Sequence, residues 1–115
     1  MMEDQYEEQT IQQQRGPTIR FTGKLLAETE FETRGRDPMR VTFEIWETPG
    51  GALVAVSQTE PAEREGHVSA NVLVVEDRSD EQAARFAVMD HFDWHDRARS
   101  MVGKQLKWKL VREVA

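Results

Sequence analysis

Residues 18–31, with the sequence TIRFTGKLLAETEF, decide the fold. Most of the apolar residues of this segment occupy odd positions: Ile19, Phe21, Leu25, Ala27 and Phe31. Alternation with a period of two is typical of a strand that buries one face. The segment therefore predicts one long, half-buried strand. Gly23 lies in the middle of its apolar face, a position typical of a bulge or of close packing.

Three further strands are predicted over 39–45, 52–58 and 68–74, and the first and last of these show the same alternation. Between the first two of these lies Thr48-Pro49-Gly50-Gly51, in which proline presets φ at the first central position of a turn. We predict a type II turn, with the positive φ at Gly50. Four consecutive strands joined by short connections predict an antiparallel meander.

Two short helices are predicted after the fourth strand. Ser79 and Gln82 have the spacing of a capping box at the start of the first helix. Asp93 is expected to cap the second helix, and Gly103 to end it. The apolar residues of the second helix recur at helical spacing: Trp94, Ala98, Met101 and Val102.

The last segment, 105–114, is predicted to be a closing strand, with a C-terminal helix as the alternative. Leu106, Trp108 and Leu110 alternate with Lys107 and Lys109. We therefore expect an α+β fold with the order β-β-β-β-α-α-β. Its four- to five-stranded antiparallel meander sheet would carry the two short helices on one face.

Residues 1–16 have a composition unlike the rest of the chain, with five glutamines and four acidic residues against one arginine. Such a segment has too few apolar side chains to offset the entropy of ordering. We predict a disordered acidic tail over 1–16 and a single domain over 17–115. Tyr6 and Ile11 would be the anchors if the tail folds on a partner.

Composition excludes some classes of function and argues against others. The chain has 115 residues, a formal net charge of -6 and no cysteine. Thiolate catalysis and cysteine-based metal sites are therefore impossible. The negative charge argues against nucleic acid, and the basic C-terminal segment is the place where such binding would have to occur. The sequence has no signal-peptide pattern and no membrane-spanning apolar run, so we expect a soluble cytoplasmic protein.

The sequence predicts no catalytic residue, no metal site and no cofactor. His91 and His95 are four residues apart, a spacing that places two ligands on one helix face. The residue after His91 is Phe92 rather than the glutamate of the zincin pattern, and a helix break at Asp93 would separate the histidines. The serines lack the context of a nucleophile elbow.

The second face of the sheet is not fully polar, since four large apolar residues are expected there: Leu26, Trp46, Leu53 and Leu73. Either the sheet curls into a partial barrel, or this face binds a protein partner or a second copy of the chain, with Trp46 at its centre. The second interpretation predicts a non-catalytic binding or regulatory module that acts through protein contacts. The alternative is a small-molecule binder or enzyme with a pocket between the sheet and the helices.

Overall fold

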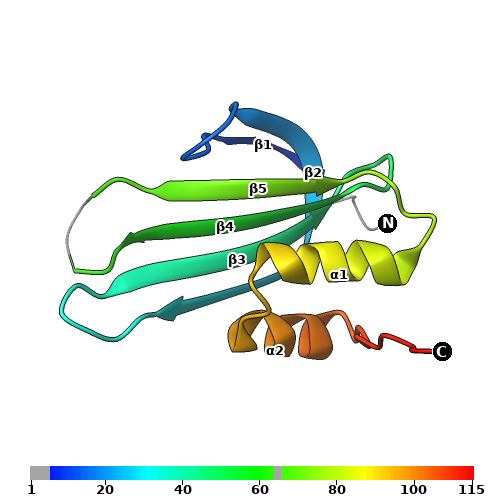
Figure 1. Cartoon of the computed structure of the whole chain (residues 1–115). Coiled ribbons are helices and arrows are strands. Elements are labelled where there is room, and N and C mark those ends of the chain that lie inside the picture. The colour runs from blue at the N-terminus through cyan, green and yellow to red at the C-terminus, as the bar shows by residue number, and fades with distance from the viewer. Residues whose placement is uncertain (1–5, 64–65) are drawn as a thin grey trace, which may run out of the picture.

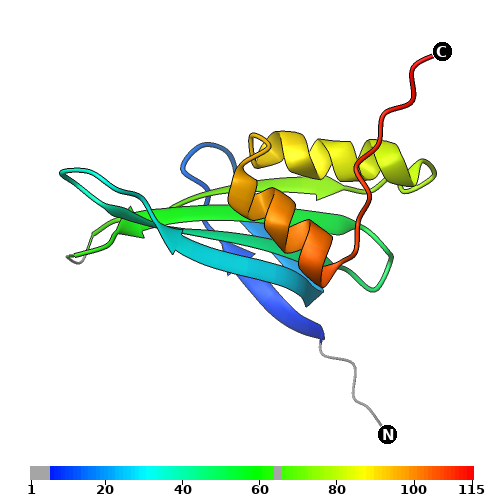
Figure 2. The same ribbon diagram turned by 90° about the horizontal axis from the view of Figure 1, so that it is seen from below.

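The computed structural model describes residues 6–63 and 66–115 and has the α+β architecture that the sequence predicts. In these described residues, five antiparallel strands form one sheet in sequential order, and two helices cover one of its faces (Figures 1 and 2). The strands are β1 (Tyr6–Ile11), β2 (Ile19–Glu32), β3 (Met39–Glu47), β4 (Leu53–Pro61) and β5 (Ser69–Val75). The helices are α1 (Glu81–His91) and α2 (Asp96–Gln105).

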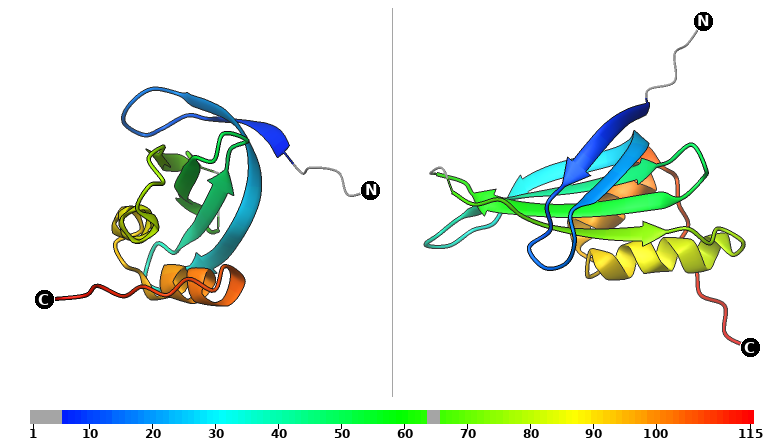
Figure 3. Two further views of the ribbon diagram at one scale, coloured as in Figure 1. Left: turned by 90° about the vertical axis from the view of Figure 1, so that its right-hand side faces the viewer. Right: turned by 90° about the horizontal axis from the view of Figure 1, so that it is seen from above.

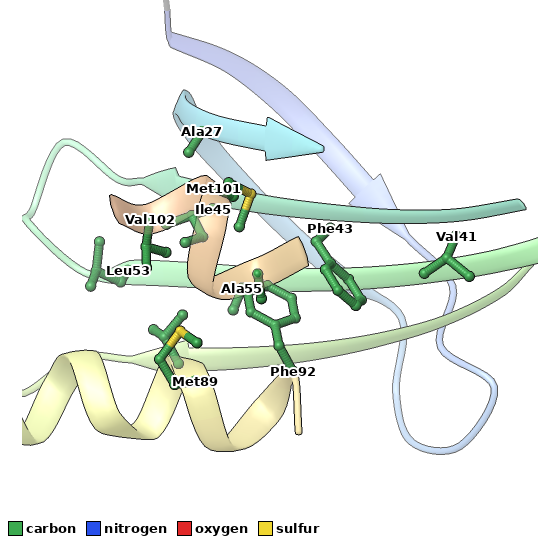
Figure 4. Close-up of a cluster of buried hydrophobic side chains, with 12 residues drawn as sticks. Ala27, Val41, Phe43, Ile45, Leu53, Ala55, Met89, Phe92, Met101 and Val102 are labelled. Carbon is green, nitrogen blue, oxygen red and sulfur yellow. The ribbon is translucent and has the colours of Figure 1, made fainter. Parts of the chain in front are cut away.

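A first core fills the space between the sheet and the helices (Figure 4). The sheet contributes the alternate residues Ala27, Val41, Phe43, Ile45, Leu53 and Ala55, and the helical layer contributes Val88, Met89, Phe92, Ala98, Met101 and Val102. The rings of Phe43 and Phe92 pack with their centroids 4.6 Å apart. Burying each large apolar side chain stabilises the fold by about 1.5–3 kcal/mol, so this layer fixes the helices on the sheet.

A β-bulge at Leu26 divides β2 into two halves that bury opposite faces. Leu25 pairs with Trp46, but Ala27 pairs with Ile45, one residue out of step. Directly paired residues lie on the same face of a sheet. The odd residues before the bulge therefore lie on the second face with Trp46, whereas those after it lie beneath the helices. The prediction that residues 18–31 bury one continuous face is thus wrong.

The first half of β2 crosses over the second face of the sheet and carries β1 with it (Figure 3). This hairpin encloses a second core, formed by Ile11, Trp46, Val54, Val56 and Ala70. The ring of Phe21 packs edge-on against Trp46 at a centroid distance of 5.8 Å. A Cβ at Gly23 would lie 2.8 Å from the Phe21 ring and 3.4 Å from the Cβ of Trp46. Gly23 is therefore a place of close packing, one of the two roles the sequence predicts for it.

The connection between β1 and β2 reaches the far edge of the sheet and closes the curl. The N–H of Gln14 donates to the carbonyl oxygen of Ala70 at 2.8 Å. The N–H of Val72 donates to Oε1 of Gln13 at 2.9 Å. We call this pair of bonds the glutamine latch. It joins the two ends of the sheet, so the interpretation of a partial barrel is confirmed.

β1 lies within the segment predicted to be a disordered tail. All six of its residues pair with β2, and Ile11 is buried in the second core. For residues 6–16 the predicted tail is therefore wrong, because β2 and the glutamine latch hold this polar segment. Residues 1–5 lie outside the described residues.

Helix α1 begins one residue later than predicted. Its N-cap is Asp80, which accepts from the N–H of Ala83 at 3.1 Å. Ser79, the predicted cap, instead donates through both its N–H and its hydroxyl to Oδ1 of Asp77.

The predicted break between the helices is confirmed, since Asp93 and Trp94 both have a positive φ. The cap of α2 is His95, not Asp93, because Nδ1 of His95 accepts from the N–H of Arg97 at 3.0 Å. The helix also continues past Gly103 to Gln105.

The turn between β3 and β4 occurs at Thr48–Gly51, but it is not of type II. The N–H of Gly51 donates to the carbonyl oxygen of Thr48 at 2.9 Å. The positive φ of 94° belongs to Gly51, not to Gly50.

Residues 106–115 do not form the predicted closing strand, and the alternative of a C-terminal helix is not observed either. Leu106, Trp108 and Leu110 pack against the first core, as their alternation indicates. Their main chain runs beside α1 rather than beside a strand. Nε2 of Gln82 donates to the carbonyl oxygen of Lys109 at 3.0 Å, and Arg85 lies over the Trp108 ring. The fifth strand of the sheet is β1.

Candidate binding trough

The four residues predicted to form a binding face do not lie together. Trp46 is in the second core and 7% exposed, so the interpretation of an exposed contact residue is wrong. Leu53 is 1% exposed, and it packs with Leu26 and Leu73 on the opposite face, beneath the helices. The prediction fails because the sequence did not indicate that β1 and the first half of β2 cover Trp46.

The two histidines that were weighed as metal ligands have other contacts. Nε2 of His91 lies 3.2 Å from the carbonyl oxygen of Asn71. Burial lowers the pKa of His91, against smaller opposing effects of this hydrogen bond and of Asp93. His95 caps α2 and stacks on the ring of Phe31 at a centroid distance of 4.7 Å. Among residues 6–63 and 66–115, no group of three possible ligand side chains could hold a metal ion.

Among residues 6–63 and 66–115, the hairpin of β1 and β2 covers the second face of the sheet around Trp46 and leaves the other half open. Three surface hollows of about 70, 300 and 340 Å³ lie there. Two of them share Thr42, and two share Gln58 and Val68, so they form one continuous surface. We call this surface the open trough. Its floor is formed by Glu28, Glu30, Arg40, Thr42, Gln58 and Glu60.

One wall of the trough is the end of β1. Thr10, Ile11 and Gln12 line the same hollow as Gln58 and Val68. Among the strands that the structure describes, β1 is the first of the sheet and pairs with β2 on one side only. Its other side faces the open half of the sheet, as the view in the right panel of Figure 3 shows. The trough is therefore bordered by the outer main-chain edge of β1 and floored by side chains of the middle strands.

The floor of the trough is acidic. Arg40 is the one basic residue of the floor in the part of the chain that the structure describes, and it lies between two carboxylates. Its Nη1 is 3.1 Å from Oε1 of Glu60, and its Nε is 3.9 Å from Oε1 of Glu30. Glu28 is paired across the strands with Glu44, at the end of the trough nearest Trp46. The three glutamates of the floor, with Glu44 beside them, outnumber its one described arginine, so the trough favours cationic groups.

Glu44 lies where the acidic floor meets the second core. Its Oε1 accepts a hydrogen bond from Nε1 of Trp46 at 3.2 Å. Burial raises the pKa of Glu44, and the nearby carboxylate of Glu28 raises it further. The hydrogen bond from Trp46 opposes both effects, but the pKa remains raised. The ionised form of Glu44 is therefore destabilised, and a cation placed beside it would stabilise that form.

The described side chains that line the trough include no nucleophile with an adjacent base. Carboxylates, hydroxyls and amides line it, and these groups accept hydrogen bonds from ammonium, guanidinium and peptide N–H groups. Glu28, Glu30 and Gln58 are not among the site residues that the sequence predicts. Their positions in the sequence could have indicated them, since these residues have even numbers in their strands, as do Thr42 and Glu44 on the same face.

Comparison of the chain with protein-family models, curated proteins and solved structures found no match. Of the helices in residues 6–63 and 66–115, none has the length and apolar character needed to cross a membrane.

Proposed function

We propose that this chain is a non-catalytic binding module that acts through protein contacts. Its open trough would hold an extended, positively charged segment of a partner protein. The observation that carries the proposal is the half-open second face, where an acidic floor adjoins an exposed strand edge. Concave openings of curled sheets are common places for ligands to bind.

The spacing of the floor suits an extended cationic chain. β2 presents Glu28 and Glu30 on the same face, two residues apart. Alternate residues of any extended chain are about 6.6 Å apart. Lysines at alternate positions of a partner would therefore have the same spacing as these carboxylates. Electrostatic complementarity of this kind raises the rate of association and the specificity more than the affinity itself.

Two other functions have less support. An enzyme or small-molecule binder with a pocket between the sheet and the helices needs space that the side chains of the first core already fill. A homodimer through the Trp46 face needs a residue that the hairpin covers. We place the module in the cytoplasm, because a chain without cysteine suits a reducing compartment.

The test uses a fluorescent peptide of alternating lysine and threonine, about ten residues long so that it exceeds a typical strand. Fluorescence anisotropy measures its binding to the full chain at low and high salt. We expect binding that weakens as salt rises, and a loss of about tenfold or more in the double variant Glu28→Lys/Glu30→Lys.

The matched control is Glu76→Lys/Glu113→Lys, which makes the same change in charge at two exposed residues outside the trough. We expect it to change the affinity by less than about threefold, the order of one screened surface charge. Circular dichroism establishes that both variants are folded. Absence of binding by the wild-type chain at low salt, or equal losses in the two double variants, would contradict the proposal.

A further inference from the structure

We infer that the partner segment joins the sheet as a sixth strand, along the open edge of β1. This inference rests on the proposed function and specifies how the trough is used. Addition of a strand to a sheet edge is a recurring mode of peptide recognition, in which main-chain hydrogen bonds give affinity and alternate side chains give specificity.

The other open strand edges of the described residues already have hydrogen-bond partners. At β5, the glutamine latch already occupies the carbonyl oxygen of Ala70 and the N–H of Val72. In the second half of β2, the side chain of Gln105 occupies both main-chain groups of Glu28. Within residues 6–63 and 66–115, β1 has no strand and no such side chain on its outer edge.

β1 is held at both ends by contacts within the chain, so its outer edge is already ordered before a partner strand binds. Ile11 anchors it in the second core, and the latch fixes the chain just beyond it. At its other end, the ammonium of Lys24 lies over the Tyr6 ring, 5.7 Å from the centroid. An edge that is already ordered avoids much of the entropic cost of binding.

The outer edge of β1 and the floor of the trough face the same space. The hollow lined by Thr10, Ile11 and Gln12 is also lined by Gln58 and Ala70. A strand added beside β1 would therefore lie over the floor of the trough. One set of its alternate side chains would point to the carboxylates there, and the other set to solvent.

The charges on β1 favour one kind of partner strand. β1 carries Glu7 and Glu8, both exposed. Charged residues on an edge strand discourage pairing between copies of the same chain. The same charges, with the acidic floor, favour a partner strand that carries lysine or arginine.

The experiment distinguishes main-chain pairing from side-chain attraction. Two versions of the lysine–threonine peptide are N-methylated, one at every lysine and the other at every threonine. Successive N–H groups of a strand point to opposite sides, so an added strand uses only one of these two sets. We expect methylation of one set to weaken binding about tenfold or more, because it removes the donors that face β1. Methylation of the other set should weaken binding less than about threefold, because those N–H groups point away from β1.

Amide exchange of the full chain supplies a second measurement. Binding of the unmodified peptide should slow exchange at alternate residues of β1, and not at exposed residues of α2 such as Arg99. If both methylated peptides bind like the unmodified one, or both lose binding equally, the strand-addition mode is wrong while the proposed function stands. If the unmodified peptide itself does not bind, the proposed function fails.

Discussion

The side chain of Gln105 forms two hydrogen bonds with the main chain of Glu28, in the second half of β2. The N–H of Glu28 donates to Oε1 at 3.1 Å, and Nε2 donates to the carbonyl oxygen of Glu28 at 2.9 Å. A side-chain amide thus takes the position that a neighbouring strand would occupy. It ties the end of α2 to the sheet at the place where the bulge has turned β1 away.

Replacement of Gln105 with alanine tests this bond pair. Gln105→Ala should lower the free energy of unfolding by about 1–2 kcal/mol, because two hydrogen bonds are lost at a surface edge. Lys104→Ala is the matched control, since Lys104 is exposed. It should change stability by less than about 0.5 kcal/mol. Urea unfolding measures both values, and equal effects would mean that the bond pair is unimportant.

Trp46→Ala should strongly destabilise the fold. The ring is buried in the second core against Phe21, and truncation of a core tryptophan costs about 3–5 kcal/mol. This is opposite to the small cost that an exposed contact residue would show. Denaturant melts measure the loss, and Trp46→Phe should recover part of it. A loss below about 1 kcal/mol would mean that the hairpin does not cover this side chain in solution.

Glu44→Gln should remove part of the pH dependence of stability. The pKa of Glu44 is raised in the folded chain, so its contribution is fully present below the unfolded value, 4.5. That contribution is lost as pH rises through the higher folded pKa. Relative to the wild type, Glu44→Gln should therefore gain stability as pH rises from about 4 to 7. Glu28→Gln, whose carboxylate raises the pKa of Glu44, should show a smaller gain in the same direction.

His91 should produce the opposite pH dependence. Burial lowers its pKa below 6.5, so its stabilising contribution is present above 6.5 and is lost as pH falls through the folded pKa. His91→Asn should therefore lose less stability than the wild type between about pH 7 and pH 5. Thermal melts at several pH values make the comparison, with the exposed His67→Asn as control. Identical slopes for His91→Asn and the wild type would contradict the burial of this ring.

The sequence predicted most of the elements because their signals are local. Period-two alternation indicated β2, β3 and β5, the apolar segment after the Thr48–Gly51 turn indicated β4, and helical spacing with polar caps indicated α1 and α2. β1 was missed because it has few apolar side chains, and distant partners hold it. Ile11 packs with Trp46, and Gln14 bonds Ala70 on the opposite edge.

The candidate site was less predictable than the fold, because it depends on a shift of one residue. The bulge at Leu26 does not change which positions carry most of the apolar side chains, since Phe21 and Leu25 before it and Ala27 and Phe31 after it all have odd numbers. The alternation therefore indicated one buried face where the chain has two. The side of the sheet on which Trp46 lies could be predicted, but not the hairpin that covers it.

The glutamine latch also bears on how fast the chain folds. Gln13 and Val72 are 59 residues apart along the chain, and their bond forms only when β5 is in place. The hairpin of β1 and β2 is local, but it has no second core to cover until the middle strands have assembled. Contacts of such long sequence separation slow folding, because loop entropy is lost before they form. Closure of the curl is therefore expected late, and Trp46 would remain in water until that step.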